Sequence, residues 1–258
     1  MSRPIASLGL LLVPAAAHAR RHPQFEPTDL ELEAPGTTEL DLQFGIVKGS
    51  DAHRIVTPDF ELDLGILDNL ELDLDGSESI KGATDGHPQF LAHNSFDDLW
   101  LSLKVGLYDQ HIYDANNEDG KDGWAVGVQV GPKLPTGVDE HGLGVEGLFL
   151  IGHALGRVHV VLAIGGLIDP HLTAAGRPYG LESGLDLQYE LTDRWALLGE
   201  VSGSIFGSSD PRQLGGTIGA QFSPTDALDL SIVAGYGLLA GNDPYGIMFG
   251  FSPKAALW

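Results

Sequence analysis

Apolar and polar residues alternate along most of this chain of 258 residues, starting at residue 37. The clearest example is the segment 60–64 (FELDL), which is followed after Leu67-Asp68-Asn69 by the similar segment 70–74 (LELDL). Neighbouring side chains of a β-strand point to opposite faces, so this period of two predicts strands with one apolar and one polar face. We expect these two segments to form a hairpin that carries carboxylates on a single face.

The same alternation predicts twelve strands. They are expected near residues 37–48, 55–66, 69–76, 96–108, 123–134, 143–153, 157–168, 179–190, 194–206, 212–222, 227–238 and 244–252. Segments of about ten residues fit tilted strands that cross a bilayer, and short turns alternate with longer loops, as at the periplasmic and extracellular ends of such barrels. The predicted fold is therefore all-β: a transmembrane antiparallel up-and-down β-barrel of about 12 strands.

One connection does not follow this rule. Residues 109–122 join the fourth and fifth predicted strands on the side where a short turn is expected. Either the strand count is wrong at this point, or this connection is unusually long.

The first nineteen residues have the features of an export signal. Arg3 precedes the apolar segment 5–13, and Ala17-His18-Ala19 is a small-x-small cleavage site. We therefore predict a signal peptide at 1–19, a short periplasmic lead-in rich in proline and charge at 20–36, and an outer-membrane β-barrel at 37–258.

Composition excludes several classes of protein. After Val13 no run approaches the ~18 consecutive apolar residues of a membrane-spanning helix. The chain has no cysteine, which rules out disulfides and cysteine nucleophiles, and its net charge of −22 disfavours a nucleic-acid partner. The expected surroundings are the lipid of a bacterial outer membrane.

If the apolar faces contact lipid, the opposite faces line the interior of the barrel. The residues predicted to line it are Glu39, Asp41, Glu61, Asp63, Glu71, Asp73, Asp98, Lys104, Gln129, Lys133, Glu146, Arg157, Glu182, Asp186 and Glu200. Acidic residues greatly outnumber the three bases in this set. One hypothesis is a cation-favouring channel or a cavity that binds a small or cationic solute; the other is a wet interior whose acids are screened by water and by the three bases. An open interior and a plugged one both fit the sequence.

No chemistry of an enzyme or a metal site is predicted. The residue types of a hydrolase occur at Ser202, Ser204, His153 and His159. No G-x-S-x-G motif surrounds them, however, and alternation places the two histidines on different faces. The acidic segment 114–122 lacks the glycine and glutamate positions of a calcium-binding loop. The glycine-rich stretches show no phosphate-binding pattern, so we expect no cofactor.

Several segments are similar to those of a known family. They are the acidic Leu-rich repeats near the N-terminus, the segment 96–107 (FDDLWLSLKVGL), the segment 130–137 (VGPKLPTG), and the hairpins within 181–201 and 219–236. Over roughly residues 37–252 the chain resembles the outer-membrane barrel proteins named as transporters of the MetA phenol-degradation pathway type. This resemblance implies passage of small, often hydrophobic or aromatic, compounds across the outer membrane.

The predicted function is an outer-membrane channel or transporter for a small solute, with an acidic interior. The first alternative is a non-transporting structural or surface-interaction barrel, with loops 77–95 and 169–178 making the contacts. The second is a soluble periplasmic β-protein, which would bury its apolar faces instead of exposing them to lipid.

Overall fold

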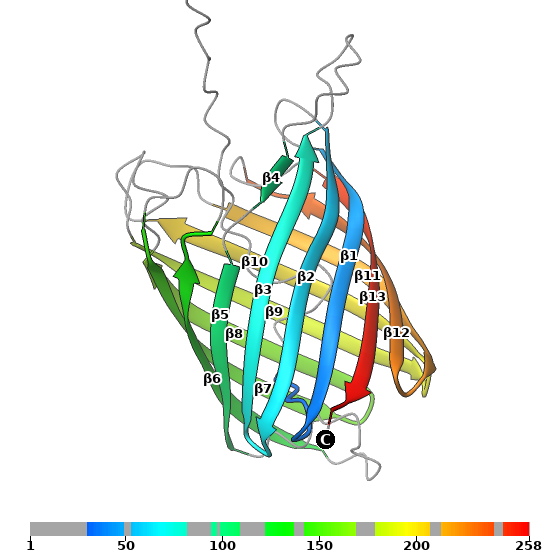
Figure 1. Ribbon diagram of the computed structural model, residues 1–258. Helices are drawn as coiled ribbons and strands as arrows, with labels where there is room; N and C mark the ends of the chain where they lie inside the picture. Colours follow the sequence, from blue (N-terminus) through cyan, green and yellow to red (C-terminus); the bar gives the residue numbers. More distant parts are fainter. Residues whose placement is uncertain are drawn as a thin grey trace, which may run out of the picture.

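The protein forms a closed antiparallel β-barrel (Figure 1). The computed structural model describes residues 30–48, 53–81, 94–96, 99–108, 122–136, 142–168, 179–206, 213–239 and 245–257. Among these residues there is no helix with the length and hydropathy needed to cross a membrane. The predicted fold class is confirmed.

Twelve long strands make up the wall. They are β1 (Thr37–Lys48), β2 (His53–Leu67), β3 (Leu70–Lys81), β5 (Leu99–Tyr108), β6 (Gly123–Leu134), β7 (Gly144–Leu155), β8 (Val158–Ile168), β9 (Tyr179–Thr192), β10 (Trp195–Phe206), β11 (Gln213–Thr225), β12 (Leu228–Gly237) and β13 (Tyr245–Ala256). A short strand, β4 (Asn94–Phe96), pairs with the end of β3. Each long strand pairs with the next in sequence, and β1 pairs with β13 to close the ring.

The predicted strand count is correct, although some boundaries differ. Strand β3 continues to Lys81 instead of residue 76, because Ile55 to Asp59 at the start of β2 pair with its second half. Strand β13 continues to Ala256 instead of residue 252. Strands β5 and β6 pair directly with one another in the ring. Residues 109–121 of the connection between them, residues 82–93 of the loop 77–95 and the whole loop 169–178 lie outside the described residues.

The two ends of the barrel differ in their connections. Tight turns at 68–69, 156–157, 193–194 and 226–227 lie at the end where β1 begins and β13 finishes, which we call the short-turn end. It is the lower end in Figure 1. Short turns on one side are typical of the periplasmic end of bacterial barrels.

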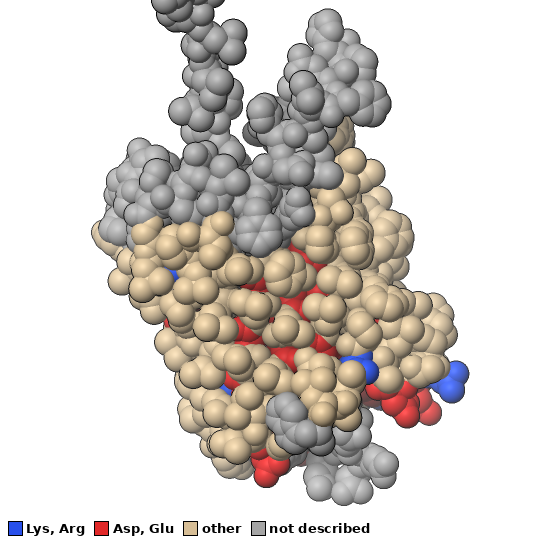
Figure 2. All heavy atoms as spheres, in the orientation of Figure 1, with Lys and Arg blue, Asp and Glu red and all other residues tan. Residues whose placement is uncertain are grey.

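The outer face of the barrel is apolar. Large side chains such as Phe44, Leu103, Phe149, Ile164 and Phe249 are exposed there. In Figure 2 most of the visible wall is tan, and the red of acidic residues shows in spaces between tan side chains and at the lower edge. Exposing so much apolar surface to water would be unfavourable, whereas lipid accommodates it.

Aromatic side chains gather near both rims, as in the aromatic girdles of membrane barrels. At the short-turn end the ring of Trp195 stacks on Phe222 with centroids 4.5 Å apart, and Trp124 meets His153 at 4.4 Å. At the other end Tyr236 and Tyr245 are directly paired across β12 and β13.

Apolar residues also occupy part of the inner face, which the alternation pattern did not predict. Leu148, Leu150, Val161 and Ala163 on β7 and β8 are buried in one cluster. A second cluster consists of Val47, Val56, Val233 and Met248, from β1, β2, β12 and β13. A register shift between Val56 and Asp59 changes which positions of β2 face inward, and so brings Val56 inside.

Candidate functional site: the acidic interior

Seven carboxylates lie on the inner faces of three neighbouring strands. They are Glu39 and Asp41 on β1, Glu61 and Asp63 on β2, and Glu71, Asp73 and Asp75 on β3, and all seven are buried. We call this set the acidic wall. Its members occupy alternate positions, so the twofold period of each strand is sufficient to direct all of them inward.

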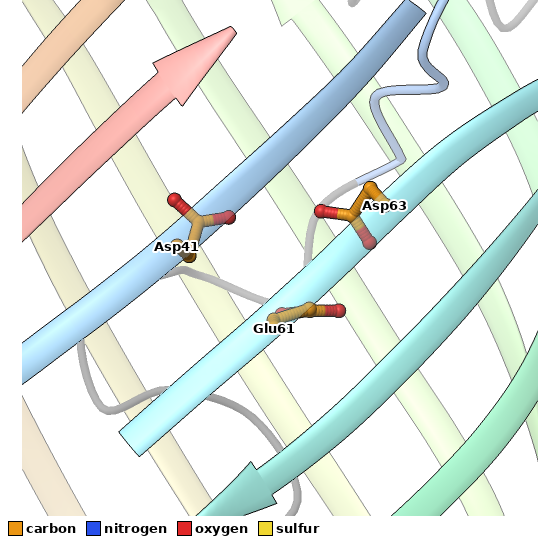
Figure 3. Close-up of side chains that lie close together, drawn as sticks. All are labelled: Asp41, Glu61 and Asp63. Atoms are coloured by element: carbon orange, nitrogen blue, oxygen red, sulfur yellow. The ribbon is translucent and has the colours of Figure 1, made fainter. Parts of the chain in front are cut away.

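The register of the strands aligns these residues in two rows. In the first row, Glu39 on β1 is directly opposite Asp63 on β2, which is directly opposite Asp73 on β3. The second row consists in the same way of Asp41, Glu61 and Asp75. Side chains directly opposite on antiparallel strands have Cβ atoms about 5 Å apart, so like charges in these rows repel. In Figure 3 the carboxylates of Asp41 and Asp63 turn toward one another across β1 and β2.

Lys104 on β5 supplies a positive charge at one edge of the acidic wall. Its Nζ lies 2.9 Å from Glu71 Oε1 and donates a second hydrogen bond of 3.0 Å to the carbonyl of Glu31. Next to it, Asp73 Oδ2 accepts hydrogen bonds from Ser102 Oγ at 3.1 Å and Gln129 Nε2 at 2.9 Å. Lys104 and Gln129 were both among the residues predicted to line the interior.

A second lysine, which was not among the residues predicted to line the interior, lies at the opposite edge of the acidic wall. Lys254 on β13 is directly paired with Glu39, and its Nζ is 2.8 Å from Glu39 Oε2, 3.3 Å from Glu33 Oε1 and 3.4 Å from Glu31 Oε1. The predicted strand ended at residue 252, so Lys254 was left outside the barrel wall. Lys254 is an even number of residues from Met248 and Ser252, which are both buried, so alternation along β13 would have placed it on the same inner face.

The chain that precedes β1 also enters the barrel. Residues 30–36 belong to the predicted periplasmic lead-in, yet they lie within the short-turn end (dark blue near the lower end in Figure 1). Leu30 is 2% exposed and packs in the inner apolar cluster of β6, β7 and β8. Its Cδ2 lies only 2.7 Å from where a Cβ on Gly127 would stand, so a residue without a side chain makes room for it.

Polar contacts hold this lead-in segment against the acidic wall. Glu33 N donates to Glu71 Oε2, and Gly36 N donates to Gly65 O at 2.9 Å. The backbone of residues 33 and 34 comes so close to Gly65 that a Cβ there would overlap it. The segment therefore narrows the interior at the short-turn end.

A small cavity remains beside the acidic wall. Its volume is about 20 Å³, and it is lined by Asp75, Trp100, Ser102, Gln129, Val130, Gly131 and Glu146. A cavity of this size holds about one water molecule. Lys133 Nζ lies 5.7 Å from the centre of the Trp100 ring, within the range of a cation–π contact.

The other predicted lining residues are placed as follows. Lys133, Glu146 and Asp186 are buried on inner faces, and Glu182 and Glu200 are half-buried on β9 and β10. Arg157 is a correction: it is exposed in the turn between β7 and β8, where its Nη1 donates to Leu191 O at 3.1 Å. The strand was predicted to begin at residue 157, but it begins at Val158, so Arg157 has no inward-facing strand position. Asp98 lies outside the described residues.

The residues considered for catalysis are not brought into one group by the described contacts. His153 contacts Trp124 near the outer rim, whereas His159 Nε2 lies 3.6 Å from Glu190 Oε1, with a partner on β9. Most of the acidic segment 114–122 lies outside the described residues; Asp122 Oδ1 accepts a hydrogen bond of 2.5 Å from Gly156 N, across to the β7–β8 turn.

Comparison with known proteins identifies similarity in fold. No family model and no curated protein matches the sequence. Among solved structures, the COG4313 outer membrane channel from Pseudomonas putida F1 superposes with a TM-score of 0.65 at 14% identity, covering 89% of this chain and 99% of that one. The KdgM porin gives a TM-score of 0.56 at 8% identity, with coverage of 83% and 98%. The NanC porin gives 0.55 at 10% identity, with coverage of 84% and 98%. The chain thus has the fold of bacterial outer-membrane β-barrels.

Proposed function

We propose that this protein is an outer-membrane channel for a small solute and that its interior favours cations over anions. The observation that carries the proposal is the acidic wall, whose seven buried carboxylates face inward from three adjacent strands. Charges of one sign in a confined space with low-dielectric walls focus the electrostatic potential and concentrate ions of the opposite sign.

Three further observations support a membrane channel. The apolar outer face requires lipid, which argues against a soluble periplasmic protein. The chain resembles barrel transporters of the MetA pathway type in its sequence motifs, and its fold is similar to a channel and two porins. One neighbour structure has a porin in complex with oligogalacturonate, but the acidic wall here would repel an anionic sugar acid. A cationic or neutral polar solute fits this interior better.

The lead-in segment 30–36 favours a second candidate function, a barrel that does not transport. Leu30 and Lys254 hold this segment across the short-turn end, where it narrows the interior. In the channel proposal, solute passes beside this segment or displaces it. In the second candidate, the segment is a permanent plug.

Conductance across a planar bilayer tests the channel proposal. The reversal potential of the purified, refolded barrel in a KCl gradient should have the sign of cation selectivity. The double variant Glu61→Gln/Asp75→Asn, which removes two interior charges, should shift that potential toward zero. The matched control Asp193→Asn/Asp226→Asn removes the same charge from exposed turns at the short-turn end and should leave the potential nearly unchanged.

Two results would count against the proposal. Anion selectivity in the unmodified barrel would contradict the role given to the acidic wall. Insertion of a correctly folded barrel that never conducts, in either salt polarity, would favour the plugged barrel.

A further inference from the structure

The geometry points to a divalent-cation site formed by Asp41, Glu61 and Asp63 on the inner faces of β1 and β2. One oxygen from each of these carboxylates lies within 4.8 Å of one oxygen from each of the others. Three points at that separation are at most roughly 2.8 Å from a common centre, whereas Ca²⁺ binds oxygens at about 2.3–2.6 Å. Shifts of a few tenths of an ångström would therefore bring all three oxygens into coordination.

Asp63 provides an observation that is independent of this proximity. It is 7% exposed, and among the described residues its Oδ1 is buried without a hydrogen-bond partner. Leaving an anionic oxygen buried and unsatisfied is costly, and a bound cation is a way to satisfy it. In Figure 3 the carboxylate of Asp63 is directed toward Asp41, and Glu61 lies beside it on the same strand.

The donors around the acidic wall indicate which carboxylates form the site. A second group of three, Asp63, Glu71 and Asp73, also meets the distance requirement. In that group, however, Lys104 Nζ is 2.9 Å from Glu71, and Ser102 and Gln129 donate to Asp73 Oδ2. A cation there would have to compete with an ammonium group 2.9 Å from one of its ligands. Asp63 belongs to both groups, so its unsatisfied oxygen does not separate them. The other two members of the first group, Asp41 and Glu61, lie farther from Lys104 in register than Glu71 and Asp73 do, so the ammonium group of Lys104 competes less for them there.

The ligand set indicates the class of ion. Carboxylate oxygens alone suit hard cations, and the absence of cysteine from the sequence removes thiolate ligands for softer metals. Three carboxylates from two rigid strands leave the remaining coordination positions to water. Ca²⁺ accepts such irregular oxygen shells more readily than Mg²⁺, which requires near-octahedral geometry at shorter distances. The site is therefore expected to prefer Ca²⁺.

This inference rests on the proposed cation-favouring interior, but it can be tested without measuring conductance. The full barrel, refolded in detergent and stripped with chelator, is titrated with Ca²⁺ and separately with Mg²⁺ by isothermal calorimetry. One Ca²⁺ should bind per barrel, more tightly than Mg²⁺. Asp63→Asn and Asp41→Asn should each weaken Ca²⁺ binding at least about tenfold. Asp186→Asn, a buried carboxylate on β9, should change it less than about twofold.

Thermal unfolding gives a second readout. The difference in melting temperature between Asp63→Asn and the unmodified barrel should change sign between chelator and Ca²⁺. In chelator, Asp63→Asn should melt at or above the temperature of the unmodified barrel, because the substitution removes repulsion within the rows. In millimolar Ca²⁺ the unmodified barrel should gain stability and Asp63→Asn should not, since a ligand stabilises only the state that binds it. A purely structural role for Asp63 would lower the melting temperature in both conditions.

Three outcomes overturn the inference. A folded, unmodified barrel that binds no Ca²⁺ removes the site, whether or not the barrel conducts. Equal weakening by Asp63→Asn and Asp186→Asn shows diffuse attraction instead of a site. Loss of binding in Asp73→Asn with full binding in Asp41→Asn places the ion in the second group.

Discussion

Replacing Lys104 by methionine tests whether the barrel depends on the charge balance of the acidic wall. Lys104 and Glu71 form an ion pair of 2.9 Å with side chains only 9% and 2% exposed. At that distance and an effective dielectric constant of about 20, the attraction is about 6 kcal/mol before desolvation is subtracted. Methionine keeps most of the side-chain length but removes the charge, leaving Glu71 facing Asp63 and Asp73.

Removing one partner of a buried pair typically costs about 3–5 kcal/mol, because the other charge remains buried. We expect Lys104→Met to lower the free energy of unfolding by this amount, measured by guanidinium titration of the refolded barrel with tryptophan fluorescence. The double variant Lys104→Met/Glu71→Gln should recover at least about half of the loss, since it leaves no carboxylate at position 71. Arg194→Met, in an exposed turn, is the control and should change stability by less than about 0.5 kcal/mol.

Two results of this double-mutant cycle would contradict the expected role of Lys104. A loss for Lys104→Met below about 0.5 kcal/mol would show that water or ions already screen the acidic wall. A double variant no more stable than Lys104→Met would show that the cost comes from lost packing of the lysine stem and not from the stranded carboxylate.

Two further substitutions test the plug and the membrane face. Lys254→Met removes the ammonium group shared by Glu31, Glu33 and Glu39, so segment 30–36 should leave the short-turn end and single-channel conductance should rise. Conductance equal to that of the unmodified barrel would mean that Leu30 and the backbone contacts are sufficient to hold the segment. Leu162→Arg, on the outer face in the middle of β8, should cost about 2–4 kcal/mol in lipid vesicles, and Leu162→Met should be nearly neutral; equal stability of the two variants would show that this face is not in the hydrocarbon layer.

Much of the barrel could be predicted from the sequence because its main determinant is local. The twofold alternation at 60–64 and 70–74 is a property of each strand alone, so it identified the hairpin of β2 and β3 and the inward direction of its carboxylates. Alternation also located the tight turns, since each follows the end of a periodic segment. On β7 the same rule placed Glu146 inward, but it did not predict that Leu148 and Leu150, which share that face, form an apolar cluster inside the barrel.

Only the tertiary structure decided how the interior is filled. The pairing of Glu39 with Lys254 depends on closure of the ring between β1 and β13, whose sequence separation of more than 200 residues leaves no local signal. Segment 30–36 forms no strand although residues 30–34 (LELEA) alternate, and its place inside the barrel results from burial of Leu30 and from the charges on Lys104 and Lys254. The period of two residues thus determines which side chains of a strand face inward. The rows of carboxylates and their counter-charges depend in addition on the register between strands, which exists only once the barrel has closed.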